Sequence, residues 1–221
     1  GSLNNNRMLS SWLRVNADGT ITVFTGKIEL GQGIATAIAQ IAADALDVDY
    51  KRIVMVTGDT SRTPDEGMTA GSLSMEQSGT AVRFACAEAR QTLMGAAAAK
   101  LGVPAADLRV ADGAITGPSG AKTSYWEVTS DAMLAREATA QAKPKGPEGY
   151  KYVGQSLIRR DIPPKFTGRP AYVQDMRLPN MLHGRVVRPP SPRAELVSYD
   201  ERGVKAMPGV VAIVRDGNYL A

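Results

Sequence analysis

Apolar and polar residues alternate near the start of the chain, in two short stretches joined by a turn. Leu13 and Val15 have polar neighbours, and residues 20–24 are rich in β-branched side chains. Between them, residues 16–19 end in Asp-Gly, a strong hairpin signal because both residue types readily adopt turn conformations. The pattern therefore predicts a β-hairpin over residues 12–25.

The spacing of apolar residues then changes from strand-like to helical. Gly31-Gln32-Gly33 follows the second strand, and apolar residues recur at positions 34, 38, 41 and 45. This spacing predicts a helix from about Ile34 to Leu46. A glycine loop between a strand and a helix places backbone N–H groups at the positive end of the helix, which suits an anion. The stretch therefore predicts a ligand that carries a phosphate.

The order of strand, loop and helix occurs a second time. Residues 53–56 predict a buried strand, and the long loop that follows is rich in Gly, Ser and Thr. Ser74 and Gln77 have the spacing of a capping box at the start of a long helix that ends near Leu101. Two small-residue loops at two helix starts could converge on one large anion, such as a nucleotide or a pyrophosphate.

The second half of the chain is less periodic. Asp112-Gly113 predicts a second hairpin, and Ser124 predicts the start of a short helix. Residues 136–149 are polar and lack periodicity, which is typical of a linker. We therefore expect an α+β fold in two parts. The expected parts are a first domain at residues 3–135, the linker at 136–149 and a second domain at 150–221, with strands near 171–173, 182–187, 196–199 and 210–214 and a helix at 200–206.

Composition limits the classes of protein that this chain can represent. The 221 residues are 43% hydrophobic, enough for a buried core, and the net charge of +4 is dispersed. Aromatic residues make up only 5%, so the sequence offers no stacking platform for nucleic acid. There is no run of eighteen apolar residues that could span a membrane. Gly1-Ser2 is typical of a remnant of tag removal, and the apolar end at residues 219–221 predicts a fragment of a longer protein.

Few residues qualify for metal or nucleophilic chemistry. Cys86 is the only cysteine and His183 the only histidine, which excludes an iron–sulfur cluster and a Cys- or His-based metal site within this chain. Cys86 falls on an apolar helix face and is expected to be inert. Glu29 and Asp59 lie near the two loops, where they either hold the loop shape by accepting N–H groups or act as catalytic carboxylates. Neither loop has the P-loop or Gly-x-Gly-x-x-Gly spacing, which disfavours an ordinary ATP or NAD site.

Several motifs together resemble one known family. Residues 29–40 resemble the signature Glu-x-Gly-Gln-Gly-x-x-Thr-x-x-x-Gln of the xanthine oxidase and aldehyde oxidoreductase family. Residues 58–82 are similar to the next block of that family's molybdopterin-binding domain, and residues 152–211 are similar to its α/β hammerhead domain. A cofactor segment that precedes the hammerhead resembles the large subunit of isoquinoline 1-oxidoreductase and related membrane- or periplasm-associated aldehyde dehydrogenases.

The resemblance implies a molybdopterin-binding-type α/β unit followed by an α/β hammerhead domain. It also implies oxidation of small aldehydes or N-heterocycles with water as the oxygen source. The implied cofactor is molybdopterin, with the cytosine dinucleotide form as one alternative. The residues that the resemblance places on this cofactor are Gly31, Gln32, Gly33, Thr36, Ala70, Gly71 and Ser72.

The implied partners are an iron–sulfur electron-transfer subunit and the rest of the same large subunit, with no nucleic acid. The implied location is the periplasm or membrane of a bacterium, with the cytoplasm as the alternative. The family's terminal catalytic glutamate and its Gly-Gly-x-Phe-Gly loop are absent from this sequence, so no catalytic or metal-binding residue is assigned. We therefore expect the isolated chain to be inactive and to bind no cofactor tightly. The alternative is a non-catalytic scaffold or subunit-contact region without a cofactor.

Overall fold

The computed structural model describes residues 2–221, so that Gly1 lies outside the described residues. Contacts between residues divide the chain into a first unit that ends at Ala171 and a second unit, Tyr172–Ala221. The two units are described separately below. The first unit begins with the short helix α1 (Ser2–Asn5), in which Ser2 is already buried.

A three-stranded sheet forms the base of the first unit. Its strands are β1 (Leu13–Val15), β2 (Ile21–Thr25) and β3 (Ile53–Thr57), in the order β1-β2-β3. β1 and β2 are antiparallel, which confirms the predicted hairpin. β2 and β3 are parallel, in a register that runs from Ile21 opposite Ile53 to Thr25 opposite Thr57. Because parallel strands end at the same edge of a sheet, the loops that follow β2 and β3 start side by side.

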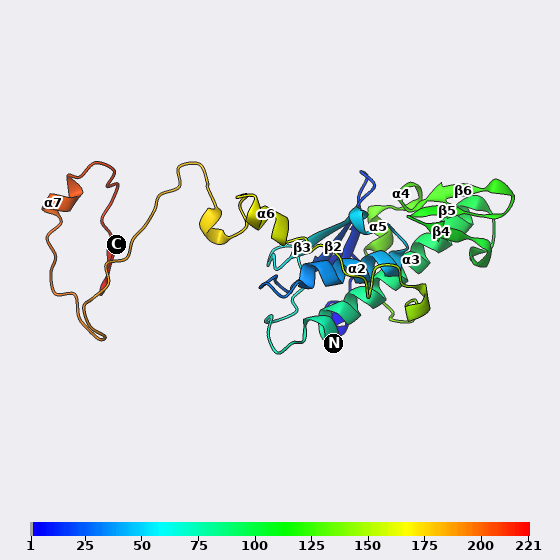
Figure 1. Cartoon of the computed structure of the whole chain (residues 1–221), viewed down its shortest axis with the longest axis horizontal. Coiled ribbons are helices and arrows are strands. Elements are labelled where there is room, and N and C mark those ends of the chain that lie inside the picture. Colours follow the sequence, from blue (N-terminus) through cyan, green and yellow to red (C-terminus); the bar gives the residue numbers. More distant parts are fainter. Residues whose placement is uncertain (1) are drawn as a thin grey trace. The chain divides into compact units, whose positions relative to one another are not determined.

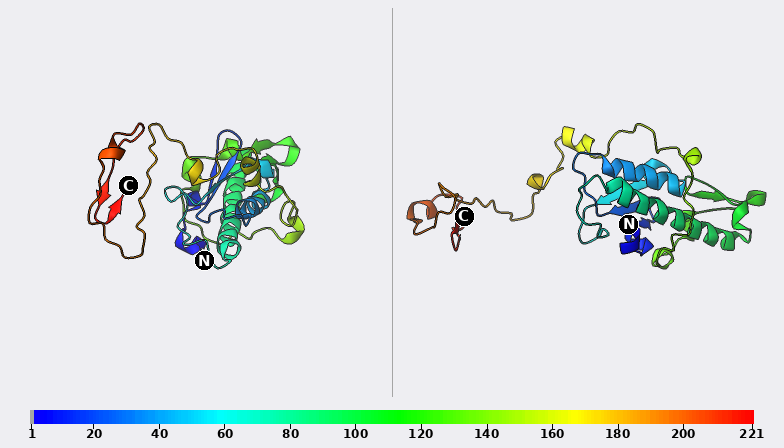
Figure 2. Two further views of the ribbon diagram at one scale, coloured as in Figure 1. Left: turned by 60° about the vertical axis from the view of Figure 1, so that its left-hand side comes forward. Right: turned by 90° about the horizontal axis from the view of Figure 1, so that it is seen from below.

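Two helices complete the core of this unit. α2 (Ile34–Leu46) is the crossover between β2 and β3, with the bounds that the sequence predicted. α3 (Thr80–Leu101) is the long helix, and α2 packs against both β3 and α3 (Figure 1, Figure 2). Both helices are rich in alanine, which allows close approach. The largest apolar side chains that they and the sheet enclose are Trp12, Leu13, Ile21, Ile38, Leu46 and Leu93.

Two details around these elements differ from the sequence prediction. β3 is not a buried strand, because it lies at the edge of the sheet and Val54 is 42% exposed. The capping box at Ser74 and Gln77 is also wrong, because residues 74–79 form a π-helix (η3, Ser74–Gly79) that leads into α3. The wider turn draws Ser78 inward, where its hydroxyl lies 2.7 Å from that of Thr25.

A small antiparallel sheet follows α3. It contains β4 (Arg109–Ala111), β5 (Ala114–Thr116) and β6 (Lys122–Ser124), so the second predicted hairpin is confirmed and gains a third strand. Ser124 caps the helix α4 (Tyr125–Val128), as expected, by accepting a hydrogen bond from Glu127 N at 3.3 Å. Tyr125 is fully buried, and its hydroxyl donates to Leu46 O at 2.9 Å, which fixes this sheet to the end of α2.

The chain then returns across the helices. α5 (Asp131–Leu134) precedes the segment expected as a linker, residues 136–149, which lies against α3. There the buried carboxylate of Glu88 accepts N–H groups of Thr139 and Ala140 at 2.9–3.0 Å. Residues 150–161, called the strap below, run along α2 and lead into α6 (Ile162–Phe166). Short 3-10 turns complete the unit at Leu9–Ser11, Tyr50–Arg52, Ala105–Asp107, Pro118–Gly120 and Pro147–Gly149.

The second unit has little regular structure. It contains a 3-10 turn (Val173–Asp175), the helix α7 (Arg202–Lys205) and a two-stranded ribbon of β7 (Arg215–Asp216) and β8 (Tyr219–Leu220). The predicted short helix is confirmed, but the strands expected at 171–173, 182–187, 196–199 and 210–214 do not form. No residue of 172–221 is buried, so these apolar segments have neither a paired strand nor a covered face to stabilise them.

Candidate functional site

Two loops meet at the edge of the main sheet where β2 and β3 end. We call residues 26–33, which follow β2, the first loop, and residues 58–73, which follow β3, the second loop. Gly58 N donates to Thr25 O at 2.9 Å, and Ile28 N donates to the Thr69 hydroxyl at 3.0 Å. The structure therefore places side by side two loops that are about forty residues apart in sequence, as the repeated strand–loop–helix order predicted.

Glycine is required at two points of this contact. A Cβ atom added to Gly26 would lie 2.3 Å from Pro64 O, and one added to Gly58 would lie 2.1 Å from a methyl carbon of Ile28. Gly58 also has a φ of 63°, which other residues adopt only with strain. At Gly26 a side chain would meet the backbone of the second loop, and at Gly58 it would meet the side chain of Ile28 from the first loop.

A buried lysine ties the two loops together. Lys27 is only 1% exposed, and its ammonium donates to Glu66 O at 2.6 Å and to Met68 O at 2.9 Å. Lysine is rarely buried to this extent because the charged group loses its hydration. The two carbonyl oxygens offset part of that cost, and they belong to the second loop.

The carboxylate of Glu66 lies in the same buried cluster. Its Oε2 accepts hydrogen bonds from the Thr25 hydroxyl at 2.7 Å, Gly26 N at 2.8 Å and the Ser78 hydroxyl at 3.1 Å. Its Oε1 is also buried and has no partner among the residues that the structure describes. The cluster joins the end of β2, the second loop and the π-helix beneath the surface of the two loops.

The N-terminus of α2 is filled by a carboxylate of the chain itself. Glu29 Oε1 accepts N–H groups of Gly31 at 2.9 Å and Gly33 at 2.8 Å, and Oε2 accepts Ala35 N at 3.3 Å. Gly33 caps the helix with a φ of 83°. The helix end that the pattern offered to a phosphate is therefore occupied by Glu29. Of the two roles considered for Glu29, the role in holding the loop shape is confirmed.

Gln32 supports the first loop from within. Its Oε1 accepts Leu30 N at 2.6 Å, and its Nε2 donates to Ile28 O at 2.9 Å. The residue is nevertheless exposed, and an amide nitrogen carries a second N–H group beyond the one used here. The side chain thus both shapes the loop and remains able to bind a ligand.

Thr36 lies under the strap. Its hydroxyl accepts Arg160 N at 3.0 Å and the residue is 6% exposed. Next to it, Arg159 donates to Gly31 O at 2.6 Å and lies 3.5 Å from Glu29 Oε1. Asp161 holds this guanidinium with two hydrogen bonds, at 2.7 and 3.0 Å. Hydrogen bonds from Arg159, and then from Lys165, hold the pKa of Asp161 well below its usual range despite partial burial.

The second loop presents its tip to the surface. Ala70, Gly71 and Ser72 are all exposed, with left-handed φ values of 65° at Gly71 and 58° at Ser72. Exposed backbone N–H groups in such turns form concave sites for anions. Asp59, at the start of this loop, accepts the hydroxyl and N–H groups of Ser61 at 2.7 and 3.0 Å. These bonds lower the pKa of Asp59, and its role is to shape the turn.

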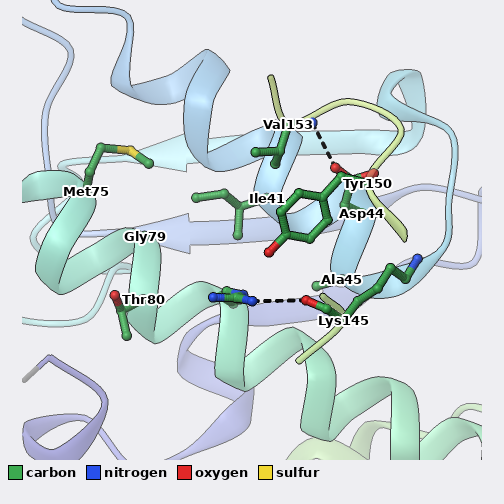
Figure 3. Close-up of a pocket in the computed structure, with 10 residues that line it drawn as sticks. Ile41, Asp44, Ala45, Met75, Gly79, Thr80, Lys145, Tyr150 and Val153 are labelled. Atoms are coloured by element: carbon green, nitrogen blue, oxygen red, sulfur yellow. Dashed lines mark hydrogen bonds between the residues drawn. The ribbon is translucent and has the colours of Figure 1, made fainter. Parts of the chain in front are cut away.

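A separate cavity of about 220 Å³ lies between α2, the start of α3 and residues 145–153 (Figure 3). Its lining is Ile41, Asp44, Ala45, Met75, Gly79, Thr80, Arg83, Lys145, Tyr150 and Val153. Asp44 accepts Val153 N at 2.8 Å, and Arg83 donates to Lys145 O at 2.9 Å, so the polar groups at its rim bind the returning chain. None of the seven residues expected on the cofactor lines it.

Other candidate groups do not join the two loops. Cys86 is fully buried on α3, and burial raises the pKa of its thiol to about 12, so it is inert as predicted. Within residues 2–221, no three His, Cys, Asp or Glu side chains are arranged to hold a metal ion. In the same residues no helix is long and apolar enough to cross a membrane.

Sequence reasoning missed three residues that shape the site. Lys27 and Glu66 occur in the two stretches that were singled out, but charged residues in loops are usually solvated, and nothing in their spacing marks them as buried. Arg159 was visible only as half of the pair Arg159-Arg160. Its contact with Gly31 spans 128 positions in sequence, which no local pattern can show.

Comparison with protein families defines the class. Residues 2–156 match the family model of the molybdopterin cofactor-binding domain, and residues 167–219 match that of the aldehyde oxidase and xanthine dehydrogenase a/b hammerhead domain. The chain therefore belongs to the molybdopterin cofactor-binding domain family, within the xanthine oxidase group, and the expected fold class is confirmed. The two matches meet between residues 156 and 167, within the first structural unit.

Individual relatives agree with this assignment. The chain is 40% identical to one subunit of the nicotinate dehydrogenase of Pseudomonas putida, over 94% of its own length and 18% of the relative's. It is 27% identical to the beta subunit of the isoquinoline 1-oxidoreductase of Brevundimonas diminuta, over 90% of its length and 31% of the relative's. It is 28% identical to the membrane-bound aldehyde dehydrogenase (pyrroloquinoline-quinone) of Gluconacetobacter polyoxogenes, over 90% of its own length and 26% of the relative's. The chain thus spans between about a fifth and a third of the length of these relatives.

Among solved structures, a Cu,Mo-CO dehydrogenase is similar to the chain with 25% sequence identity and a TM-score of 0.47. The similarity covers 52% of this chain and 15% of that one.

Proposed function

We propose that this chain is part of the large subunit of a molybdenum hydroxylase and that its two loops contact the pterin cofactor. One observation carries the proposal. In a chain of the molybdopterin cofactor-binding family, the two loops that resemble the family's cofactor segments lie side by side, joined by the bond from Ile28 N to Thr69. The proposed contacts are Gly31, Gln32, Gly33, Thr36, Ala70, Gly71 and Ser72.

The local chemistry fits an anionic group better at the second loop than at the first. Ala70, Gly71 and Ser72 expose backbone N–H groups and a hydroxyl. At the first loop, two glycine N–H groups already bind Glu29, so Gln32 is the residue there that could donate to the cofactor. Thr36 is the weaker candidate among the proposed contacts, because its hydroxyl already accepts Arg160 N. When bound, the cofactor would supply the redox chemistry, while the residues of this chain bind and orient it.

The proposed reaction of the complete protein is the oxidation of an aldehyde or an N-heterocycle with water as the oxygen source. The names of two relatives, a nicotinate dehydrogenase and an isoquinoline oxidoreductase, support an N-heterocycle. The proposed partners are an iron–sulfur subunit and the rest of the large subunit. A periplasmic or membrane-associated site is supported by the membrane-bound relative. The cytosine dinucleotide form remains one proposed form of the cofactor, and we expect the isolated chain to be inactive.

The test uses the complete subunit with Gln32→Ala. If Gln32 contacts the cofactor, loss of its hydrogen bonds should lower the affinity for the pterin about tenfold. Molybdenum analysis and pterin fluorescence after gel filtration would measure the retained cofactor. Gln91→Ala, on the exposed side of α3, is the matched control. Equal cofactor content in both variants would contradict the proposal.

A second candidate function is a scaffold that binds no cofactor. Two observations favour it: Glu29 fills the N-terminus of α2, and the hydroxyl of Thr36 is taken by Arg160 N. If the chain is such a scaffold, Gln32→Ala and Ser72→Ala should both leave the cofactor content of the complete subunit unchanged. A bulky substitution at the exposed tip, such as Ser72→Arg, should then weaken only the association between subunits, measured by analytical ultracentrifugation.

A further inference from the structure

We infer that Lys27 is a positioning residue that holds the two loops as one surface, with Glu66 as the acidic member of its cluster. This inference rests on the proposed function for its purpose, but its structural content stands by itself. Neither residue belongs to the seven proposed cofactor contacts. Lys27 precedes Gly31 by four residues, and Glu66 precedes Ala70 by four.

The first argument is the burial of the ammonium group. Lys27 is 1% exposed, whereas an apolar residue of similar length could fill the same space without the cost of dehydrating a charge. The ammonium therefore supplies something that packing alone does not. Its two hydrogen bonds reach Glu66 O and Met68 O, and charge-assisted bonds of this kind are stronger than neutral ones. These two bonds fix the backbone of the second loop at residues 66 and 68, directly before Thr69.

The second argument is where the fixed segment leads. The hydroxyl of Thr69 accepts Ile28 N, so the second loop is bonded to the first at residues 66, 68 and 69. From there the chain runs directly into Ala70, Gly71 and Ser72, which are all exposed. The two hydrogen bonds of Lys27 are thus the nearest buried contacts that hold the exposed tip of the second loop.

The third argument is the arrangement of Glu66. Oε2 accepts three hydrogen bonds, while the buried Oε1 has no partner within residues 2–221. The ammonium of Lys27 carries three N–H groups and uses two of them on carbonyls. The bonds of both groups therefore run to the two loops and to the π-helix, and not to each other. An apolar replacement of Lys27 would leave two carbonyls of the second loop without their donor.

The experiment measures hydrogen exchange by mass spectrometry in the 221-residue chain. In Lys27→Met, the amides of Gly26, Ile28 and Gly67, which are hydrogen-bonded where the loops meet, should exchange at least about tenfold faster, because the loops separate more often without the bonds of Lys27. Amides of β1, β2 and α3 should keep their wild-type rates. Lys51→Met, which removes an exposed lysine in the 3-10 turn before β3, is the matched control and should change neither region.

A chemical rescue separates the ammonium from the shape of the side chain. Lys27→Cys in a Cys86→Ala background, alkylated with 2-bromoethylamine while unfolded and then refolded, restores an ammonium at nearly the lysine position. Slow exchange at the amides of Gly26, Ile28 and Gly67 should return. Unchanged exchange in Lys27→Met would overturn the inference. A uniform rise across all strands, loss of folding in Lys27→Met, or failure of the alkylated variant to recover would also overturn it, since each assigns Lys27 to the core as a whole.

Cofactor retention by the complete subunit tests whether the hydrogen bonds of Lys27 matter for cofactor binding. Lys27→Met should retain at least about tenfold less molybdenum and pterin than the wild type, comparable to Gln32→Ala. Full cofactor content in Gln32→Ala defeats the proposed function, whereas unchanged loop exchange in Lys27→Met defeats this inference. The two failures therefore appear in different measurements.

Discussion

The first and second loops have similar sequences and positions, but different hydrogen bonds stabilise them. Both connect a strand of the main sheet to a helix, and both are rich in glycine and small polar residues. The first loop is stabilised by its own side chains, since Glu29 and Gln32 bind the loop backbone from within. The start of the second loop is also held by a side chain of its own, Asp59, but its residues 66 and 68 are held by the ammonium of Lys27 from the first loop, and its tip makes few bonds.

The difference shows that a glycine loop before a helix is not by itself an anion site. In the first loop the N–H groups that would bind a phosphate already bind the carboxylate of Glu29. In the second loop the backbone around Gly71 stays exposed because its anchor lies elsewhere. A loop can therefore bind an anion only through backbone N–H groups that are not already bonded within the protein.

The largest expected effect is at the crossing of the two loops. Gly26→Ala would place a Cβ atom 2.3 Å from Pro64 O, so the loops must separate, and we expect a loss of about 3 kcal/mol in the free energy of unfolding. Urea denaturation would measure it. Gly95→Ala, in the open interior of α3, should instead stabilise the chain by roughly 0.5–1 kcal/mol. If Gly26→Ala proves as stable as the wild type, the loops are not in contact as described.

Removal of Glu29 should make the first loop resemble the second. Glu29→Ala should cost about 1–2 kcal/mol, the range for loss of a helix cap, and should free the N–H groups of Gly31 and Gly33. Phosphate should then raise the Tm of the variant but not that of the wild type, because only the variant offers an empty helix N-terminus. Glu76→Ala, in the exposed part of the π-helix, serves as the control for lost negative charge. Equal phosphate responses would show that Glu29 does not block the site.

Acid should weaken the hold of the strap on the first loop. The pKa of Asp161 is lower in the folded chain than in the unfolded one, so Asp161 stabilises the fold above pH about 4 and loses this effect as the pH falls further. Asp161→Asn should cost about 1 kcal/mol at pH 7 and should flatten the decline of stability below pH 4. Urea melts between pH 7 and pH 3 would measure both. A parallel decline in the two proteins would mean that Asp161 is not paired with Arg159.

The smallest expected effect is loss of the bond between the loops at the surface. Thr69→Val keeps the size of the side chain but removes the acceptor for Ile28 N, which water can partly replace, so we expect about 0.5 kcal/mol. Thermal unfolding would detect a change of this size when compared with Thr80→Val, on the exposed start of α3. A loss much larger than this would mean that Thr69, rather than Lys27, carries the contact between the loops.

Local patterns predicted most of the first unit. The hairpin, α2, the β4–β5 hairpin and α4 have strong periodicity or turn signals, and they formed where expected. The convergence of the two loops also followed from sequence, because two successive strand–loop–helix units place both loops at one sheet edge. The strands of the second unit failed, since an apolar alternating segment becomes a strand only when a partner is available to pair with it.

The details of the candidate site were beyond sequence reasoning for a different reason. Burial of Lys27, the orphaned oxygen of Glu66 and the contact of Arg159 with Gly31 all depend on residues far apart in the chain, by as many as 128 positions. Contacts between residues so far apart in sequence have no characteristic spacing from which they could be predicted. The chain also gave no sign that residues 136–161 return across α2 and α3, because their bonds run mostly from backbone N–H groups to Glu88 and Asp44.

The π-helix at Ser74–Gly79 has a consequence for how this site can change in evolution. A π turn contains one residue more than an α turn, and it arises most simply from a single inserted residue in an existing helix. Each residue of an α-helix rotates the chain by about 100°, so deleting one residue here would pull the second loop away from Thr25 and Lys27, which bind its residues 66 and 68. The length of this turn is therefore constrained by the contact between the two loops, and the extra residue is part of what keeps them side by side.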